Sequence, residues 1–174
     1  MIRKYFILIF LSIFIHAQGD FELEDLNPNS DTYGNLIGPS YYMDDIVVVF
    51  FGHEYWGACR SRFAFLNEVQ SELNAMGVDD VSFIGVGKDE YNSDLEGMIN
   101  DYTIPWVEDQ ESEEYPVWLD YEAVQRSTYF LDRNGDLIYQ FNITTLDPNN
   151  SDDFFYLINL ILDYRSEDGP NVVR

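Results

Sequence analysis

The sequence predicts one α/β domain in which a mixed central sheet carries helices on both faces. Three observations lead to this prediction: two short apolar runs, a helical pattern that links them, and a hairpin signal in the second half of the chain. Strands joined through a helix are parallel, whereas strands joined through a tight turn are antiparallel. The expected order of elements is therefore β-α-β-α-β-β-α, and 174 residues suffice for one such domain.

The parallel part is predicted from two strands and the helix between them. Residues 46–52 and 81–87 are continuous apolar runs rich in β-branched residues, as expected of strands that are buried on both faces. Between them, residues 57–76 repeat apolar side chains at steps of three and four. This periodicity indicates an amphipathic helix, which Gly77 ends.

The second half is predicted to contain a short helix, an acidic loop, a hairpin and a last helix. Residues 95–102 form the short helix, and residues 106–116 are expected to be loop. Residues 128–141 form two antiparallel strands joined by a turn at Gly135. The last helix, at about residues 147–164, is expected to be largely covered because its apolar residues spread widely around it.

Both ends of the chain are expected to lie outside the domain. Two basic residues precede an apolar run, and small residues follow it, so residues 1–19 are predicted to be a secretory signal peptide. The run is shorter than the roughly 20 residues of a membrane span, and an uncleaved anchor is the alternative. The other expected segments are an extended lead-in (20–45), the domain itself (46–165) and a C-terminal tail (166–174).

The charge balance excludes whole classes of ligand. The chain has 9 Lys and Arg against 32 Asp and Glu, a formal net charge of −23. A surface of this sign repels the phosphates of nucleic acids and anionic lipid headgroups, so neither nucleic-acid binding nor stable membrane association after signal cleavage is expected. The one cysteine, Cys59, excludes internal disulfides, and Cys and His are too few for a zinc site. No metal ion or cofactor is predicted.

A cluster of carboxylates leaves a third, weaker hypothesis, an acidic module that binds cations. Its members lie within seven residues and are Glu108, Asp109, Glu111, Glu113 and Glu114. Calcium takes oxygen ligands, but this spacing does not match an EF-hand loop. A solvated acidic loop is the simpler interpretation.

Several segments, taken in order, resemble the thioredoxin-like superfamily. Residues 50–60 (FFGHEYWGACR) resemble the stretch in which a strand leads into W-C-x-x-C. Residues 21–27 are similar to the D-F-x-L-x-D-L-N lead-in of secreted redoxin domains, and residues 129–135 resemble the F-L-I-D-x-x-G hairpin. Residues 104–106 and 117–118 also resemble the N-terminal domain of selenoprotein P. The resemblance implies a thioredoxin-like fold and thiol–disulfide chemistry.

Two departures from the family pattern limit that implication. If Cys59 is the second cysteine of the motif, Trp56 stands at the first, nucleophilic position, where selenoprotein P has selenocysteine. An indole cannot form a thiolate, so ordinary dithiol turnover is not expected. The cis-proline that usually precedes the third strand is also missing, because Arg126, Ser127 and Thr128 stand there.

Each candidate site residue has two interpretations. Cys59 is either a buried structural residue or a reactive monothiol, whose pKa the helix N-terminus and Arg60 would lower. His53 is either a base toward this thiol or an ordinary loop histidine. Tyr55 and Trp56 form either an exposed aromatic ridge for a partner or a plug over the vacant redox position.

The sequence therefore predicts a secreted or periplasmic thioredoxin-like protein that is degenerate in dithiol redox activity. It is expected to bind a protein or thiol partner through the turn from Tyr55 to Cys59. The alternative is a monothiol oxidoreductase or peroxidase that uses Cys59 with an external resolving thiol. A homodimer linked through Cys59 is also compatible with an oxidising compartment.

Overall fold

The computed structural model describes residues 19–166. The predicted signal peptide up to residue 18 and the tail from residue 167 onward lie outside the described residues. Among residues 19–166, no helix has the length and apolar character that a membrane crossing requires.

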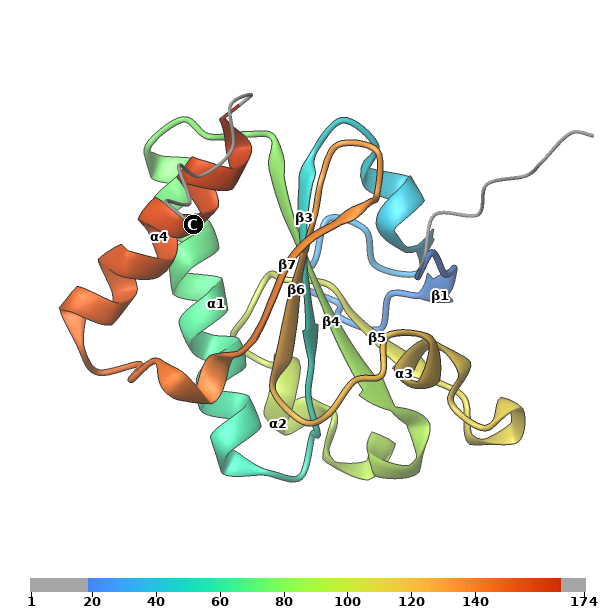
Figure 1. Ribbon diagram of the computed structural model, residues 1–174. Helices are drawn as coiled ribbons and strands as arrows, with labels where there is room; N and C mark the ends of the chain where they lie inside the picture. The colour runs from blue at the N-terminus through green and yellow to red at the C-terminus, as the bar shows by residue number, and fades with distance from the viewer. Residues whose placement is uncertain (1–18, 167–174) are drawn as a thin grey trace, which may run out of the picture.

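A five-stranded mixed sheet forms the centre, in the order β5-β4-β3-β6-β7 (Figure 1). Its strands are β3 (Ile46–Phe51), β4 (Val81–Lys88), β5 (Trp106–Asp109), β6 (Ser127–Leu131) and β7 (Leu137–Asn142). Strands β3, β4 and β5 are parallel, and β6 runs antiparallel to both β3 and β7. Because β3 is central and all six of its residues are buried, both faces of the sheet need cover.

Helices provide that cover, which confirms the predicted arrangement. Figure 1 shows the two long helices on one side of the sheet and α3 with the N-terminal hairpin on the other. The helices are α1 (Gly57–Ala75), α2 (Glu96–Ile99), α3 (Pro116–Asp120) and α4 (Ser151–Arg165), and the hairpin strands are β1 (Leu23–Glu24) and β2 (Leu36–Ile37). Short 3-10 turns η1 (Pro39–Tyr42), η2 (Asp89–Asp94), η3 (Glu111–Glu113) and η4 (Ile143–Thr145) lie in the connections.

Alternate residues of β3 belong to two separate cores. Val48 and Phe50 pack in the cluster that includes α1, α2 and α4. Val49 and Phe51 pack in the second cluster, which contains Trp118 of α3 and residues of the hairpin. Successive side chains of a strand point to opposite faces, so this one apolar run anchors both layers.

The expectation of a loop over residues 106–116 is wrong for its first four residues. Trp106–Asp109 form the edge strand β5, and all four residues are buried. Carboxylates are almost never fully buried without partners, and this is why the acidic sequence suggested a loop. In the structure the Asp109 carboxylate accepts hydrogen bonds from the backbone N–H groups of Gln110 and Trp118, at 3.1 and 2.9 Å, which offsets the cost of its burial.

Residues 20–45 pack onto the domain rather than merely leading into it. Strands β1 and β2 pair antiparallel, and the N–H of Leu26 donates to the carbonyl of Trp106 at 2.8 Å, which ties the hairpin to β5. The side chain of Asn27 donates to the carbonyls of Tyr102 and Ile104, at 2.9 and 2.7 Å. The lead-in is thus an integral edge of the fold.

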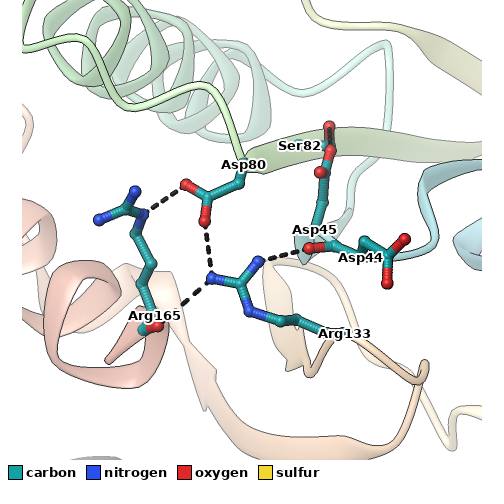
Figure 2. Close-up of polar contacts among 6 residues, drawn as sticks. All are labelled: Asp44, Asp45, Asp80, Ser82, Arg133 and Arg165. Atoms are coloured by element: carbon teal, nitrogen blue, oxygen red, sulfur yellow. Dashed lines mark hydrogen bonds and ion pairs between the residues drawn. The ribbon is translucent and has the colours of Figure 1, made fainter. Parts of the chain in front are cut away.

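A cluster of ion pairs closes the end of the domain at which β4 begins. One carboxylate oxygen of Asp80 lies 2.6 Å from the Arg133 guanidinium, and the other accepts a hydrogen bond from Arg165 (Figure 2). Arg133 also donates to the backbone carbonyls of Asp44 and Arg165. Asp80 therefore joins the start of β4, the β6–β7 hairpin and the end of α4.

Candidate functional site

The turn between β3 and α1 brings Cys59 and Trp56 to the same end of the sheet. Trp56 is the N-cap residue directly before α1, and its carbonyl accepts hydrogen bonds from the N–H groups of Cys59 and Arg60, at 2.8 and 3.1 Å. Cys59 therefore lies in the first turn of α1. This geometry places an indole one helical turn ahead of the only thiol in the sequence.

Cys59 is a free thiol that solvent does not reach. Its exposed fraction is 0%, and it packs in the core cluster beneath α1. Burial raises the pKa of the Cys59 thiol, although the backbone amide of His53 and the guanidinium of Arg126 act in the opposite direction. A raised pKa and the lack of access both reduce the amount of thiolate that could attack a substrate. The geometry thus agrees with the structural interpretation of Cys59.

Tyr55 and Trp56 lie exposed at the tip of the turn. Their exposed fractions are 66% and 47%, so Trp56 does not fold back as a plug. The space beneath them is taken by His53, whose ring centroid lies 5.7 Å from that of Trp56 and 3.4 Å from that of Tyr91. An exposed aromatic pair on a well-packed base is a typical anchor for a partner protein.

The imidazole of His53 is not placed to act as a base toward Cys59. Its Nδ1 accepts a hydrogen bond from the N–H of Tyr55 at 3.3 Å, and its ring stacks on Tyr91. Burial lowers the pKa of His53, so the ring is neutral at pH 7. Only the backbone amide of His53 acts on the thiol.

The arginine whose charge acts on the Cys59 thiol, lowering its pKa, is Arg126, not Arg60. Arg60 instead donates from Nε to the carbonyl of Glu54 at 2.6 Å. Arg126 stands directly before β6, where the family pattern has proline, and its φ of 69° lies in the left-handed region. Its N–H donates to the carbonyl of Phe51 at 2.7 Å, which fixes the loop beside the thiol. Nothing in the spacing of residues along the chain indicates that Arg126 acts on Cys59. The one sequence feature near Arg126 that the sequence analysis singled out is the missing proline.

Two buried carboxyl groups lie beneath the turn. The sequence did not indicate Glu54 as a site residue, and it indicated Glu108 only as a member of the acidic cluster. Glu54 is 0% exposed and Glu108 is 5% exposed. Glu54 accepts a hydrogen bond from the indole of Trp106 at 3.0 Å, and Glu108 accepts one from the side chain of Asn92 at 2.9 Å. The second oxygen of each carboxyl group has no hydrogen-bond partner among the described residues. Room for Glu54 depends on Gly87, because a Cβ there would collide with the carboxyl group.

These two groups hold protons more tightly than exposed carboxylates do. Burial raises the pKa of Glu54 to about 7, and the nearby charge of Glu108 acts in the same direction. The pKa of Glu108 is also raised by its burial. Of the two, Glu54 is the group whose charge acts on the Cys59 thiol, and it raises the pKa of that thiol.

The segment η2 lies over this part of the site. Tyr91 stacks on His53, Asn92 binds Glu108, and Asp94 forms an ion pair with Arg60 at 3.5 Å. These contacts fasten η2 to the turn after β3, to the edge strand β5 and to the first turn of α1. Among residues 19–166, no group of three or more His, Cys, Asp or Glu side chains could hold a metal ion.

No protein-family model matches the chain, and no curated protein matches its sequence. Solved structures do match. The thioredoxin domain of a thiol-disulfide oxidoreductase from Bacteroides vulgatus is 17% identical and has a TM-score of 0.58, over 83% of this chain and 94% of that chain. Copper-bound Sco1 from yeast is 13% identical and has a TM-score of 0.64, over 87% of this chain and 92% of that chain.

A secreted disulfide oxidoreductase from Mycobacterium tuberculosis, homologous to Escherichia coli DsbE, is a further match. It is 14% identical with a TM-score of 0.59, over 82% of this chain and 94% of that chain. The chain has a thioredoxin-like fold. The turn after β3 contains the residues whose sequence resembles the W-C-x-x-C stretch, so the next question is which side chains it presents.

The turn after β3 carries one thiol, Cys59. Reduction of a disulfide by a dithiol cycle needs one thiolate to attack and a second thiol to release the mixed disulfide. The chain has a single cysteine, and its sulfur is buried. What the turn offers to solvent is the aromatic pair of Tyr55 and Trp56. The likeness to selenoprotein P stays a prediction.

Proposed function

We propose that this thioredoxin-like protein does not catalyse dithiol exchange and instead binds a protein partner through the turn at Tyr55 and Trp56. The observation that carries the proposal is the inversion at this turn, where the aromatic pair is exposed and the thiol is covered. Tyr and Trp are enriched among residues that contribute most to binding energy. The net charge of −23 favours a partner with a basic surface, through long-range attraction.

A gain-of-function variant tests the loss of dithiol chemistry. Trp56→Cys restores a C-x-x-C motif at the start of α1 without removing a core side chain, because Trp56 is half exposed. We expect this variant to catalyse insulin reduction by dithiothreitol, whereas the wild type and the matched control Trp56→Ser do not. Catalysis by the wild type would refute the proposal.

The binding surface is tested by site-specific photocrosslinking. A photoreactive phenylalanine analogue at position 56 is compared with one at Phe155, an exposed aromatic residue on α4. We expect one partner to crosslink at position 56 only, to be displaced by excess unlabelled protein, and to be lost with Tyr55→Ala. Crosslinking that is equal at both positions, or that Tyr55→Ala does not change, would count against the turn as the contact surface.

We further propose export of the chain from the cytoplasm. The charged and apolar pattern of residues 1–19 supports this, as does the fold it shares with a secreted disulfide oxidoreductase. Expression in a bacterium with an export system, followed by N-terminal sequencing of the periplasmic fraction, tests it. A chain that keeps its first residues and stays in the cytoplasm would contradict export.

A monothiol peroxidase is the second candidate, favoured by the Arg126 guanidinium that faces Cys59. The Cys59 thiolate would attack hydrogen peroxide to give a sulfenic acid and release hydroxide. One external thiol would form a mixed disulfide and release water, and a second would reduce that disulfide and restore Cys59. Peroxide consumption that depends on added thiol and is lost in Cys59→Ser would favour this candidate. The burial of Cys59 opposes both this reaction and a disulfide between two copies.

A further inference from the structure

A small cavity opens beside the turn, between the ends of β3 and β4 and helix α3. Its volume is about 170 Å³, several times the space that one water molecule needs. Its walls include His53, Lys88, Tyr91, Trp118, Ala123 and Gln125. In open α/β sheets, ligands commonly bind outside the carboxyl ends of parallel strands, and the parallel strands β3 and β4 end here.

Lys88 supplies a positive charge to this cavity. It is the only lysine among residues 19–166, and its ammonium forms no ion pair or hydrogen bond with another described residue. The Nζ atom lies 4.1 Å from the ring centroid of Tyr115 and 5.0 Å from that of Trp118. These rings orient the ammonium, but its three N–H groups do not donate hydrogen bonds to them as they would to a carboxylate.

The buried carboxylate of Asp109 forms no ion pair with this lysine. Asp109 feels the charge of Lys88, but its two oxygens are occupied by the N–H groups of Gln110 and Trp118. The ammonium therefore keeps its capacity to hydrogen-bond an anion. The amide of Gln125 is a second donor in the wall, and His53 is neutral at pH 7.

We propose that this cavity binds a small monocarboxylate. The carboxylate lies against the ammonium of Lys88 and the amide of Gln125. The rings of Tyr91 and Trp118 pack against the short apolar part of the ligand. One cation pairs directly with one negative charge, whereas a dianion would keep a second, unpaired negative charge close to Glu90, whose charge acts on both His53 and Tyr91. This inference goes beyond the proposed partner binding and does not depend on it.

The test is a titration of the folded protein with sodium propionate at constant ionic strength. Calorimetry measures the heat of binding, and thermal denaturation measures the change in melting temperature. We expect saturable binding with a dissociation constant on the order of 1 mM, as is reasonable for so small a ligand. Lys88→Met should weaken it at least about tenfold, because the apolar stem over Tyr115 and Trp118 is kept while the charge is lost. Arg62→Gln, which removes a positive charge from α1 instead, should bind as the wild type does.

A second variant keeps the test decisive if Lys88→Met folds poorly. Ala123→Leu leaves Lys88 in place but fills the cavity, so it should also abolish binding while circular dichroism stays that of the wild type. Absence of saturable binding in the wild type would overturn the proposal. So would unchanged affinity in either cavity variant, or tighter binding of sulfate than of propionate. None of these outcomes bears on insulin reduction by Trp56→Cys, so the two proposals fail separately.

Discussion

The indole N–H of Trp106 donates a 3.0 Å hydrogen bond to the carboxyl group of Glu54, and both side chains are fully buried. The two residues come from β5 and from the turn after β3, so the bond links the edge of the sheet to the candidate site. A carboxyl group in this position is stable when protonated, because burial penalises its charged form.

The first prediction is that stability falls as the pH rises. The folded-state pKa of Glu54 is about 7, above its value of 4.5 in an exposed carboxyl group. The folded state thus holds the proton more tightly, and its contribution is complete below pH 4.5 and is lost between pH 4.5 and about 7. The loss amounts to about 3 kcal/mol.

Melting temperatures between about pH 5 and pH 8 check this, since that range spans most of the predicted titration. The wild type should lose stability across it, and Glu54→Gln should show a flatter profile. Glu72→Gln, at an exposed position of α1, is the control and should follow the wild type. Parallel profiles for all three proteins would show that Glu54 does not titrate as the structure predicts.

The second prediction concerns the carboxylate that joins two arginines at the far end of the domain (Figure 2). Asp80→Asn should lower the free energy of unfolding by about 1 kcal/mol, a modest value because the arginines are more than a third exposed. Urea denaturation measures the change, with Asp79→Asn as the neighbouring exposed control. Salt screens such pairs, so the difference between the two variants should shrink at 1 M salt.

The stability difference between the wild type and Asp80→Asn should also depend on pH. Burial acts to raise the pKa of Asp80, but the hydrogen bonds and charges of Arg165 and Arg133 outweigh it and hold the pKa below its ordinary value. A lowered pKa means that the contribution is present above about pH 4 and is lost as the pH falls through the folded value. The gap between wild type and Asp80→Asn should therefore close in acid, opposite in sign to the trend at Glu54.

The layers of the fold could be predicted because local patterns agree with the global arrangement. The apolar run of β3 is buried on both faces, and the periodicity of α1 ends at Gly77, whose φ of 78° only glycine adopts without strain. The hairpin glycine, Gly135, has a φ of 82° for the same reason. Turn chemistry and side-chain period are local properties, so one sequence suffices to find them.

Fewer residues of the candidate site could be predicted from the sequence. Glu54 and Glu108 belong to a class of residue that is almost always exposed, and only the three-dimensional contacts with Trp106 and Asn92 reveal their burial. Arg126 reaches Cys59 across a separation that no periodicity encodes. Sequence reasoning does place the lone thiol and the aromatic turn together, because both lie within one strand-to-helix connection.

The third prediction is that Cys59 is unreactive in the folded protein. Modification by a disulfide reagent at pH 7 should be at least about 100-fold slower than in urea, because the thiol is inaccessible and its pKa is raised. A matched control places a thiol on the same helix at an exposed site, as Ser61→Cys combined with Cys59→Ser. The control should react at the rate of an unfolded thiol. Equal rates for the two folded proteins would revive the monothiol candidate.

The last prediction concerns position 126, where the thioredoxin-like sequence pattern described above would place a proline. The resemblance suggests that proline would be tolerated there, but the structure predicts the opposite. Proline fixes φ near −65°, whereas Arg126 has a φ of 69°, and proline lacks the N–H that donates to the carbonyl of Phe51 at 2.7 Å. Arg126→Pro should therefore lower the free energy of unfolding by about 3 kcal/mol.

Arg126→Gly is the matched variant, because glycine adopts this φ freely and keeps the N–H. It loses only side-chain contacts, including the 2.7 Å hydrogen bond from Nε to Thr144, and should cost about 1 kcal/mol. It should also raise the pKa of the Cys59 thiol further, since the facing positive charge is gone. If urea denaturation finds Arg126→Pro as stable as Arg126→Gly, the backbone at 126 can adopt the φ that proline requires. The loop beside Cys59 would then be less rigid than its hydrogen bonds to Phe51 and Thr144 imply.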